Sequence, residues 1–184
     1  MPSGLEWAAI LRAIRENERL MALSCFGKDI QVYASCYLDE EGEAYVTFRG
    51  TATGEEWIDN VMGSFAEETK SQKEALAYVE ALPFDKMTVA GHSKGGNKAQ
   101  YVALLSEKVS RCISMDGQGF SREFLEKYSP EIAANSRKIR NYSLSTDYVH
   151  VNLLDTYRIH QRKHSIFRGF ISFTFFYLHY KTIQ

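Results

Sequence analysis

The sequence predicts a single α/β domain spanning residues 1–184, with a mostly parallel sheet flanked by helices and an antiparallel hairpin near its N-terminus. The first observation is size and balance, because 184 residues with 45% apolar and 24% charged residues suit one globular domain. The second is an alternation of short apolar segments with segments of helical periodicity, which is typical of parallel βαβ units. The third is the turn sequence D-E-E-G between two strand-like segments, which indicates a hairpin.

The N-terminal part is expected to form a helix followed by the hairpin. Apolar residues recur at helical spacing over residues 6–23, which predicts an amphipathic helix. Apolar and more polar residues alternate over residues 29–38, which predicts a half-buried strand. The turn at residues 39–42 then leads to a returning strand over residues 45–48.

The remainder is expected to form the parallel part of the sheet. Helices are predicted over residues 57–65, 71–81, 95–105 and 121–128, and strands over residues 87–90, 112–115 and 139–144. Ligands in such folds bind at the carboxyl ends of the strands. The residues that follow each strand are therefore the first candidates for a functional site.

Composition narrows the function and the compartment. A net charge of −1 shows no excess of basic residues, which is the electrostatic feature expected of a nucleic-acid-binding protein. Three cysteines without a C-x-x-C pair, and no N-terminal signal sequence, favour a cytoplasmic protein. The apolar run over residues 167–180 is short and interrupted by Arg168 and His179, so we expect a buried element and no transmembrane segment. None of these features indicates an oligomeric state.

The most informative stretch is G-H-S-K-G-G-N-K-A, which could be a phosphate-binding loop or a nucleophile turn. A phosphate loop requires a lysine directly after its second glycine, and then a hydroxyl residue. Gly91 and Gly96 have the required spacing, but Asn97 follows them and Lys98 comes one position late. Ala99 stands where the hydroxyl would be needed. These departures exclude the phosphate loop.

The same stretch contains G-x-S-x-G between a predicted strand and a predicted helix, which makes Ser93 a candidate nucleophile. In this motif the serine lies on a strained turn, and the two glycines let the strand and the helix approach each other. The motif alone is also compatible with an ordinary tight turn. A serine nucleophile needs a histidine base and a carboxylate that orients the histidine, so these partners decide between the two interpretations.

Candidate partners follow Ser93 in the chain order acid, then histidine. Asp147 follows the last predicted strand and is the favoured acid, whereas Asp116 is an alternative because an aspartate before a glycine is also a natural turn residue. Among the later histidines, His164 is the favoured base and His160 the alternative, because both lie in a polar stretch. Their spacing of four could suit a metal, but no third ligand or H-E-x-x-H accompanies them. We therefore expect neither a metal nor an organic cofactor.

An oxyanion hole takes one N–H from the residue after the nucleophile, which is Lys94, and one from an earlier loop. The sequence Y-V-T-F-R-G-T offers such a loop, with Gly50 allowing close approach and Thr51 supplying an N–H and a hydroxyl. One such donor typically contributes about 3–4 kcal/mol to transition-state stabilisation.

Several motifs in order carry a family resemblance. They are F-R-G-T, E-W-I-D-N, G-H-S-K-G-G-N, S-M-D-G-Q-G-F, T-D-Y-V-H and K-H-S-I-F. Over residues 33–167 the sequence resembles the class 3 (fungal-type) lipases of the α/β-hydrolase fold. It is closer still to a bacterial lipase-like branch with a G-H-S-K-G-G-N nucleophile elbow. Gln118 stands where that branch usually has proline.

The resemblance implies a serine hydrolase that cleaves carboxylic esters, lipid-like or short-chain, through an acyl-enzyme and a Ser-Asp-His triad. It implies Ser93 as nucleophile, Asp147 as acid, His164 as base, and Thr51 with Lys94 at the oxyanion hole. The interval between acid and histidine is shorter than in the fungal lipases, so an insertion that shapes the acyl pocket is reduced or absent. A catalytically inactive module of the same fold, binding a lipid or protein partner, is the alternative.

Overall fold

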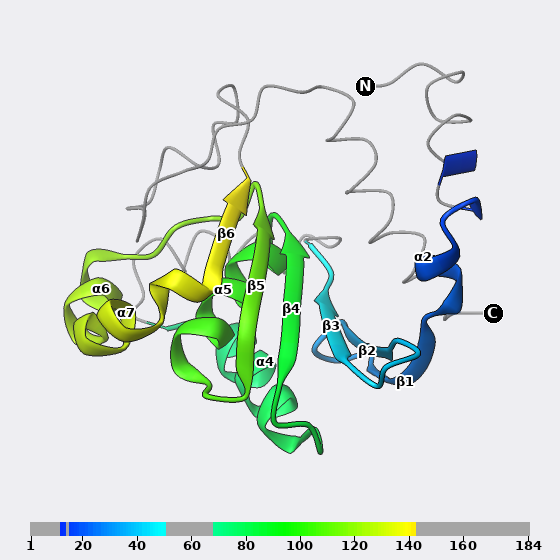
Figure 1. The fold of residues 1–184 in the computed structure, drawn as a ribbon. Helices are drawn as coiled ribbons and strands as arrows, with labels where there is room; N and C mark the ends of the chain where they lie inside the picture. The colour runs from blue at the N-terminus through cyan, green and yellow to red at the C-terminus, as the bar shows by residue number, and fades with distance from the viewer. Residues whose placement is uncertain (1–11, 14, 51–67, 143–184) are drawn as a thin grey trace.

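Six strands form one sheet in the order β1-β2-β3-β4-β5-β6 in the computed structural model (Figure 1). The structure describes residues 12, 13, 15–50 and 68–142. The strands β1, β2 and β3 pair antiparallel, and β3 to β6 pair parallel, which confirms the predicted mostly parallel sheet with an N-terminal hairpin. The strand bounds are β1 Ser24–Asp29, β2 Ala34–Leu38, β3 Ala44–Phe48, β4 Met87–His92, β5 Val109–Met115 and β6 Ile139–Tyr142.

Helices connect the parallel strands. The bounds are α2 Glu18–Ala22, α4 Lys70–Ala81, α5 Lys94–Leu105, α6 Arg122–Lys127, α7 Ser129–Asn135 and the 3₁₀ helix η1 Ser136–Lys138. Right-handed crossovers between strands that are neighbours in both sequence and space place their helices on one face of a sheet. Helices α4 and α5 accordingly lie behind strands β4 and β5 in Figure 1.

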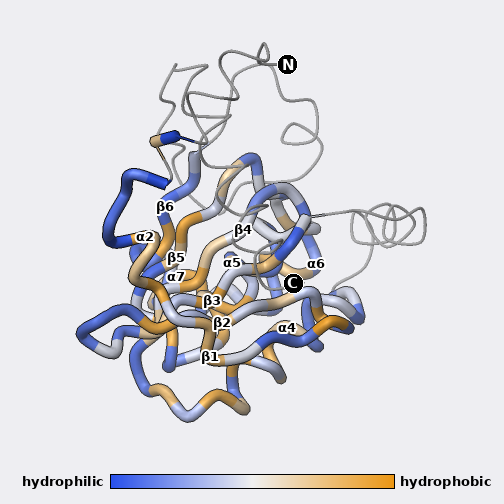
Figure 2. The backbone as a smooth tube through the Cα atoms, turned by 90° about the vertical axis from the view of Figure 1, so that its right-hand side faces the viewer, coloured by the Kyte–Doolittle hydropathy of each residue, from blue (hydrophilic) through white to orange (hydrophobic). Residues whose placement is uncertain are grey.

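The hydrophobic core lies between the sheet and these helices. Val46, Val89, Cys112 and Ile139 stand directly opposite one another on β3, β4, β5 and β6, and all four are buried. Figure 2 shows that apolar residues follow the strands, whereas the loops around them are hydrophilic. Among the described helices, none is long and apolar enough to cross a membrane.

The sequence located most elements of the parallel part. The predicted elements over residues 71–81, 87–90, 95–105, 112–115 and 121–128 correspond to α4, β4, α5, β5 and α6. The strand predicted over residues 139–144 corresponds to β6 in its described part, and the helix predicted over residues 57–65 lies outside the described residues. Helix α7 was not predicted, although Pro130 in its first turn is a position where proline favours a helix start.

The expected continuous helix over residues 6–23 is wrong in its C-terminal part. The chain leaves the helical conformation at Asn17, whose Oδ1 accepts a hydrogen bond from the N–H of Leu20 at 3.0 Å and starts the short helix α2. This is the usual role of an asparagine N-cap, and it overrides the apolar periodicity. Residues 1–11 and 14 lie outside the described residues.

The single strand expected over residues 29–38 is correct for residues 34–38, which form β2, and wrong before them, because the chain turns at residues 30–33. Asp29 ends β1, and its Oδ1 accepts hydrogen bonds from the N–H groups of Gln31 and Val32 at 2.8 and 2.9 Å. Tyr33 then has φ 54°, which is incompatible with an extended strand. Lys98 of α5 secures this turn, since its Nζ donates to the carbonyl of Val32 at 3.0 Å.

Candidate active site

Strand β4 passes into helix α5 through Ser93, which has φ 55° and ψ −123°. These angles are those of the first central residue of a type II′ turn, a position that glycine normally fills. A conformation of this kind costs on the order of 1–3 kcal/mol in a residue with a side chain. The surrounding backbone holds it in place. The Ser93 N–H donates to the carbonyl of Met115 at 2.9 Å, and its carbonyl accepts from Asn97 at 3.1 Å.

The glycines of the motif are required by backbone contacts. A Cβ at Gly91 would lie 2.1 Å from the carbonyl oxygen of Gly95, and a Cβ at Gly95 would lie 2.2 Å from that of Phe48. A Cβ at Gly50 would lie 2.9 Å from the carbonyl oxygen of His92. The first turn of α5 is therefore packed directly against the end of β3.

The hydroxyl of Ser93 does not cap helix α5 within the described part of the chain. Ser93 occupies the N-cap position of α5, yet within the described residues its hydroxyl makes no capping hydrogen bond. The residue is half-buried at the carboxyl edge of the sheet, where parallel sheets bind ligands. The N-terminus of α5 adds partial positive charge at this point, which favours an anion developing beside the serine. Lys94, the next residue and the predicted oxyanion donor, is buried in the first turn of α5.

Asp116, the alternative acid, lies at the same edge of the sheet. It follows β5, has φ 45°, and is buried. Its N–H donates to the carbonyl of Tyr142 at 2.8 Å, which joins the ends of β5 and β6. Its Oδ2 lies 3.8 Å from Nε2 of His92, the residue that precedes Ser93. A strained carboxylate residue thus stands beside a strained serine on the neighbouring strand.

The loop that follows Asp116 packs on the first turn of α5. A Cβ at Gly117 would lie 2.2 Å from Oγ of Ser114, and a Cβ at Gly96 would lie 2.9 Å from the Cα of Gly117. Asn97 of α5 binds this loop, because its Nδ2 donates to the carbonyls of Gln118 and Gly119 at 3.1 and 3.0 Å. These contacts bring D-G-Q-G-F next to the turn at Ser93.

Gln72 of α4 completes this arrangement. Its Nε2 donates to Oδ1 of Asn97 at 2.8 Å, and its Oε1 accepts from the N–H of Thr69 at 2.7 Å. The second contact belongs to a capping box, in which Oγ1 of Thr69 accepts from the N–H of Gln72. Sequence reasoning assigned no role to Gln72. The pattern T-x-x-Q indicates the cap, but nothing local indicates the bond to Asn97.

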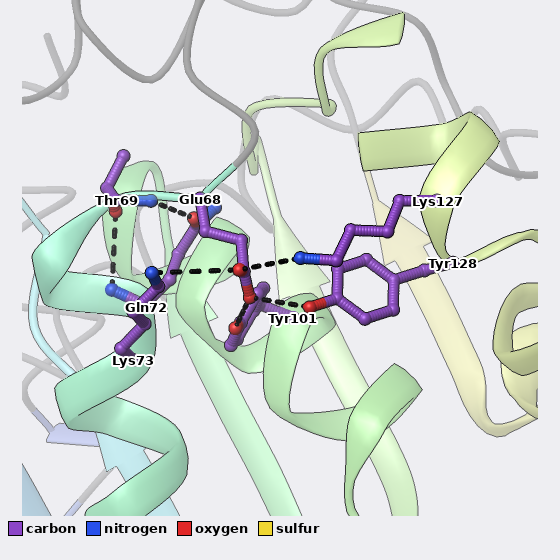
Figure 3. A network of polar contacts seen from close by, with 7 residues as sticks. All are labelled: Glu68, Thr69, Gln72, Lys73, Tyr101, Lys127 and Tyr128. Carbon is purple, nitrogen blue, oxygen red and sulfur yellow. Dashed lines mark hydrogen bonds and ion pairs between the residues drawn. The ribbon is translucent and has the colours of Figure 1, made fainter. Parts of the chain in front are cut away.

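A second polar cluster surrounds Glu68, just before α4 (Figure 3). Its carboxylate accepts hydrogen bonds from the hydroxyls of Tyr101 and Tyr128, the latter at 2.9 Å. Lys127 and Lys73 place their Nζ atoms 3.3 and 3.7 Å from its Oε2. Burial by itself raises the pKa of Glu68, but the hydrogen bonds from Tyr101, Tyr128 and Lys127 outweigh it and hold that pKa below its ordinary value. The cluster joins the start of α4 to α5 and α6.

The described structure therefore brings together Ser93, Lys94 and Asp116 at one edge of the sheet. The other predicted site residues, Thr51, Asp147, His160 and His164, lie outside the described residues. Within the described ranges, no group of three His, Cys, Asp or Glu side chains is placed to hold a metal ion.

Two solved lipase structures are similar to this one. A fungal lipase–inhibitor complex, described as a model for interfacial activation in lipases, matches with a TM-score of 0.50 and 16% identity over 79% of this chain and 69% of that one. M37 lipase matches with a TM-score of 0.43 and 15% identity over 74% of this chain and 59% of that one. A search among curated proteins finds no match. The fungal structure shows that this chain has a lipase-like α/β fold.

The family model described as Mbeg1-like matches residues 22–159, well over half of the sequence, and the chain therefore belongs to the Mbeg1-like family.

Proposed function

We propose that this protein is a serine hydrolase that cleaves carboxylic esters, with Ser93 as its nucleophile. The observation that carries the proposal is the backbone of Ser93, held at φ 55° and ψ −123° between β4 and α5. Strain of this kind persists where the surrounding structure imposes it, and it is concentrated at functional sites. The hydroxyl makes no capping bond within the described residues, so it is not required for the start of α5. The lipase-like fold supports the same reaction class.

The reaction proceeds in two halves. Ser93 Oγ attacks the ester carbonyl while His164 takes its proton, and the tetrahedral intermediate expels the alcohol, which receives that proton. A water molecule, activated by the same histidine, then attacks the acyl-enzyme and releases the carboxylic acid. Asp147 orients the histidine. No metal or organic cofactor takes part in these steps.

The oxyanion is bound by the N–H of Lys94 and by the N–H and hydroxyl of Thr51. The position of Lys94 in the first turn of α5 supports its part, because the N–H groups of that turn point toward the N-terminal end of the helix. The N–H of Ser93 itself donates to the carbonyl of Met115, so the N–H of Lys94 is the better candidate to bind the oxyanion.

The substrate is a lipid-like or short-chain ester. The short interval between Asp147 and His164 supports a small acyl pocket. A near-neutral net charge and the absence of a basic footprint argue against nucleic acid as a partner, and a cytoplasmic location is part of the same proposal.

The nucleophile is tested with a fluorophosphonate probe, which phosphonylates activated serines. Folded wild-type protein should be labelled and should hydrolyse short p-nitrophenyl esters, whereas Ser93→Ala should do neither. If folded wild-type protein shows neither labelling nor turnover, the enzyme proposal is wrong, and an inactive module that binds a lipid or a protein partner becomes the better description.

The acid and the base are tested by two paired substitutions. Asp147→Asn should lower kcat by about 10⁴-fold, the effect expected when a triad acid is lost, whereas Asp116→Asn should retain most of the activity. His164→Ala should abolish turnover while His160→Ala largely spares it. The reverse result in either pair would transfer the role to Asp116 or to His160.

A further inference from the structure

A series of hydrogen bonds runs from the start of α4 to the loop beside the nucleophile turn. It passes through three amide groups, one in the backbone and two in side chains. The Thr69 N–H donates to Gln72, Gln72 donates to Asn97, and Asn97 donates to the carbonyls of Gln118 and Gly119. Gln72 is 6% exposed and Asn97 is 7% exposed. A hydrogen bond that these side chains lose is therefore not readily replaced by a bond to water.

The side-chain amides of Gln72 and Asn97 have only one orientation that satisfies all of these hydrogen bonds. Two carbonyls face the Nδ2 of Asn97, so its amide nitrogen must point at the loop and its oxygen must point at Gln72. That oxygen needs a donor, which places the amide nitrogen of Gln72 toward Asn97. The oxygen of Gln72 then faces the Thr69 N–H and accepts from it. Reversing either amide would set oxygen against oxygen and nitrogen against a donor.

The loop held by these hydrogen bonds touches the nucleophile turn. Gly117 packs against Gly96, three residues after Ser93, with no space for a side chain at either glycine. Asp116, at the start of the loop, faces the histidine that precedes Ser93. The contacts of Asn97 thus fix the loop on the same turn that contains Lys94, one of the proposed oxyanion donors.

We propose that Gln72 and Asn97 are positioning residues of the hydrolase, which orient the 116–119 loop and the first turn of α5 for acylation of Ser93. The inference rests on the function proposed above. A displacement of reacting groups by about 1 Å can cost on the order of 10²-fold in rate, so a bond that fixes this turn affects catalysis without touching the substrate.

The decisive variant is Gln72→Glu. A carboxylate of the same size still accepts from the Thr69 N–H, and glutamate at this position is the commoner partner in a capping box. While ionised it cannot donate to Asn97, and it sets a carboxylate oxygen against Oδ1 of Asn97, so the link toward the loop is lost and Tm falls. We expect fluorophosphonate labelling of Ser93 and the kcat for a short p-nitrophenyl ester to fall about 10- to 100-fold at a temperature well below that Tm, with KM changed less than about twofold.

Two further variants separate positioning from stability. Asn97→Asp keeps the acceptor for Gln72 but loses both donors to the loop, and it should slow labelling in the same range. Thr69→Ala removes the hydroxyl cap but keeps the backbone N–H that Gln72 binds, so it should lower Tm while labelling proceeds at the wild-type rate.

The outcomes distinguish this inference from the proposed function. If wild-type protein is labelled and Gln72→Glu is labelled equally fast, the positioning role is wrong and the hydrolase proposal stands. If Thr69→Ala slows labelling as much as Gln72→Glu does, with both measured well below their Tm values, the effect follows stability and the positioning role is also wrong. If folded wild-type protein is not labelled, both fail together.

Discussion

At the scale of single residues, Ser93 combines a candidate reactive group with an unfavourable backbone conformation. Substitution by alanine keeps the Cβ and so keeps the strain, whereas glycine removes it. The strain of about 1–3 kcal/mol exceeds the extra unfolded-state entropy of glycine, which costs about 0.4–1 kcal/mol. We therefore expect Ser93→Gly to be more stable than Ser93→Ala by about 1 kcal/mol.

Urea unfolding of the two variants measures this difference, and neither variant retains a hydroxyl to complicate it. An alanine variant as stable as the glycine variant would mean that the turn is not strained at Ser93. At Gly27, where an added Cβ meets nothing within 4 Å, Gly27→Ala carries the entropic effect alone, should raise stability by about 0.4–1 kcal/mol and serves as the control.

The residue scale also shows how far the sequence could predict the site. The spacing of Gly91, Ser93 and Gly95 is local and was sufficient to locate the turn between β4 and α5, on which Ser93 is the proposed nucleophile. The bond between Gln72 and Asn97 joins residues 25 positions apart on two helices, so no local pattern could indicate it. Asp116 was indicated by its place after a strand, but its contact with His92 depends on the pairing of β4 with β5.

At the scale of elements, Glu68 joins the start of α4 to α5 and α6. Its side chain is 11% exposed and accepts hydrogen bonds from two tyrosines and a lysine. Its pKa lies below the ordinary value of 4.5, so the charged form stabilises the folded protein above that pH. This contribution is lost as the pH falls through the folded-state pKa.

Glu68→Gln should therefore lower the free energy of unfolding at neutral pH by about 1–3 kcal/mol, because the amide nitrogen meets hydroxyls and ammonium groups arranged for a carboxylate. The difference from wild type should shrink as the pH falls below 4.5. Glu74→Gln on α4 is the control, since its ion pair with Lys70 is exposed and worth at most a few tenths of a kcal/mol. A pH-independent effect of Glu68→Gln would contradict the assignment.

The elements that sequence analysis misplaced lie where a side chain bonds the backbone. Asn17 and Asp29 each accept N–H groups within a few residues, which ends one element and starts the next. The pattern of apolar residues does not reveal such bonds, because it is evaluated over a window of several residues. The parallel strands and helices α4, α5 and α6 were predicted well because short apolar segments alternate there with segments of helical periodicity.

At the scale of the whole molecule, the sheet is best supported in its centre. Strand β4 is hydrogen-bonded on both sides, by β3 and β5, and α5 covers one of its faces. Strand β1 is at one end of the sheet order, has a register shift between Cys25 and Gly27, and is largely exposed. Regions with few buried contacts open locally, whereas central strands open only with the whole domain.

Native-state hydrogen exchange should therefore find the slowest amides in β4 and the adjoining part of β5, with protection close to the global free energy of unfolding. Amides of β1 should exchange faster and through local opening, with little dependence on denaturant. Equal protection of β1 and β4 would mean that the hairpin and the parallel part unfold as one unit.

The crowding around Gly91 and Gly95 also determines how this sequence can change over evolutionary time. Backbone carbonyls exclude a side chain at both positions, whether or not the protein turns over a substrate. Ser93 is under the opposite pressure, because its conformation favours glycine. A lineage that lost the activity would therefore be expected to keep both glycines and to exchange the serine. Within this family, Ser93 rather than the glycines that flank it should distinguish active members from inactive ones.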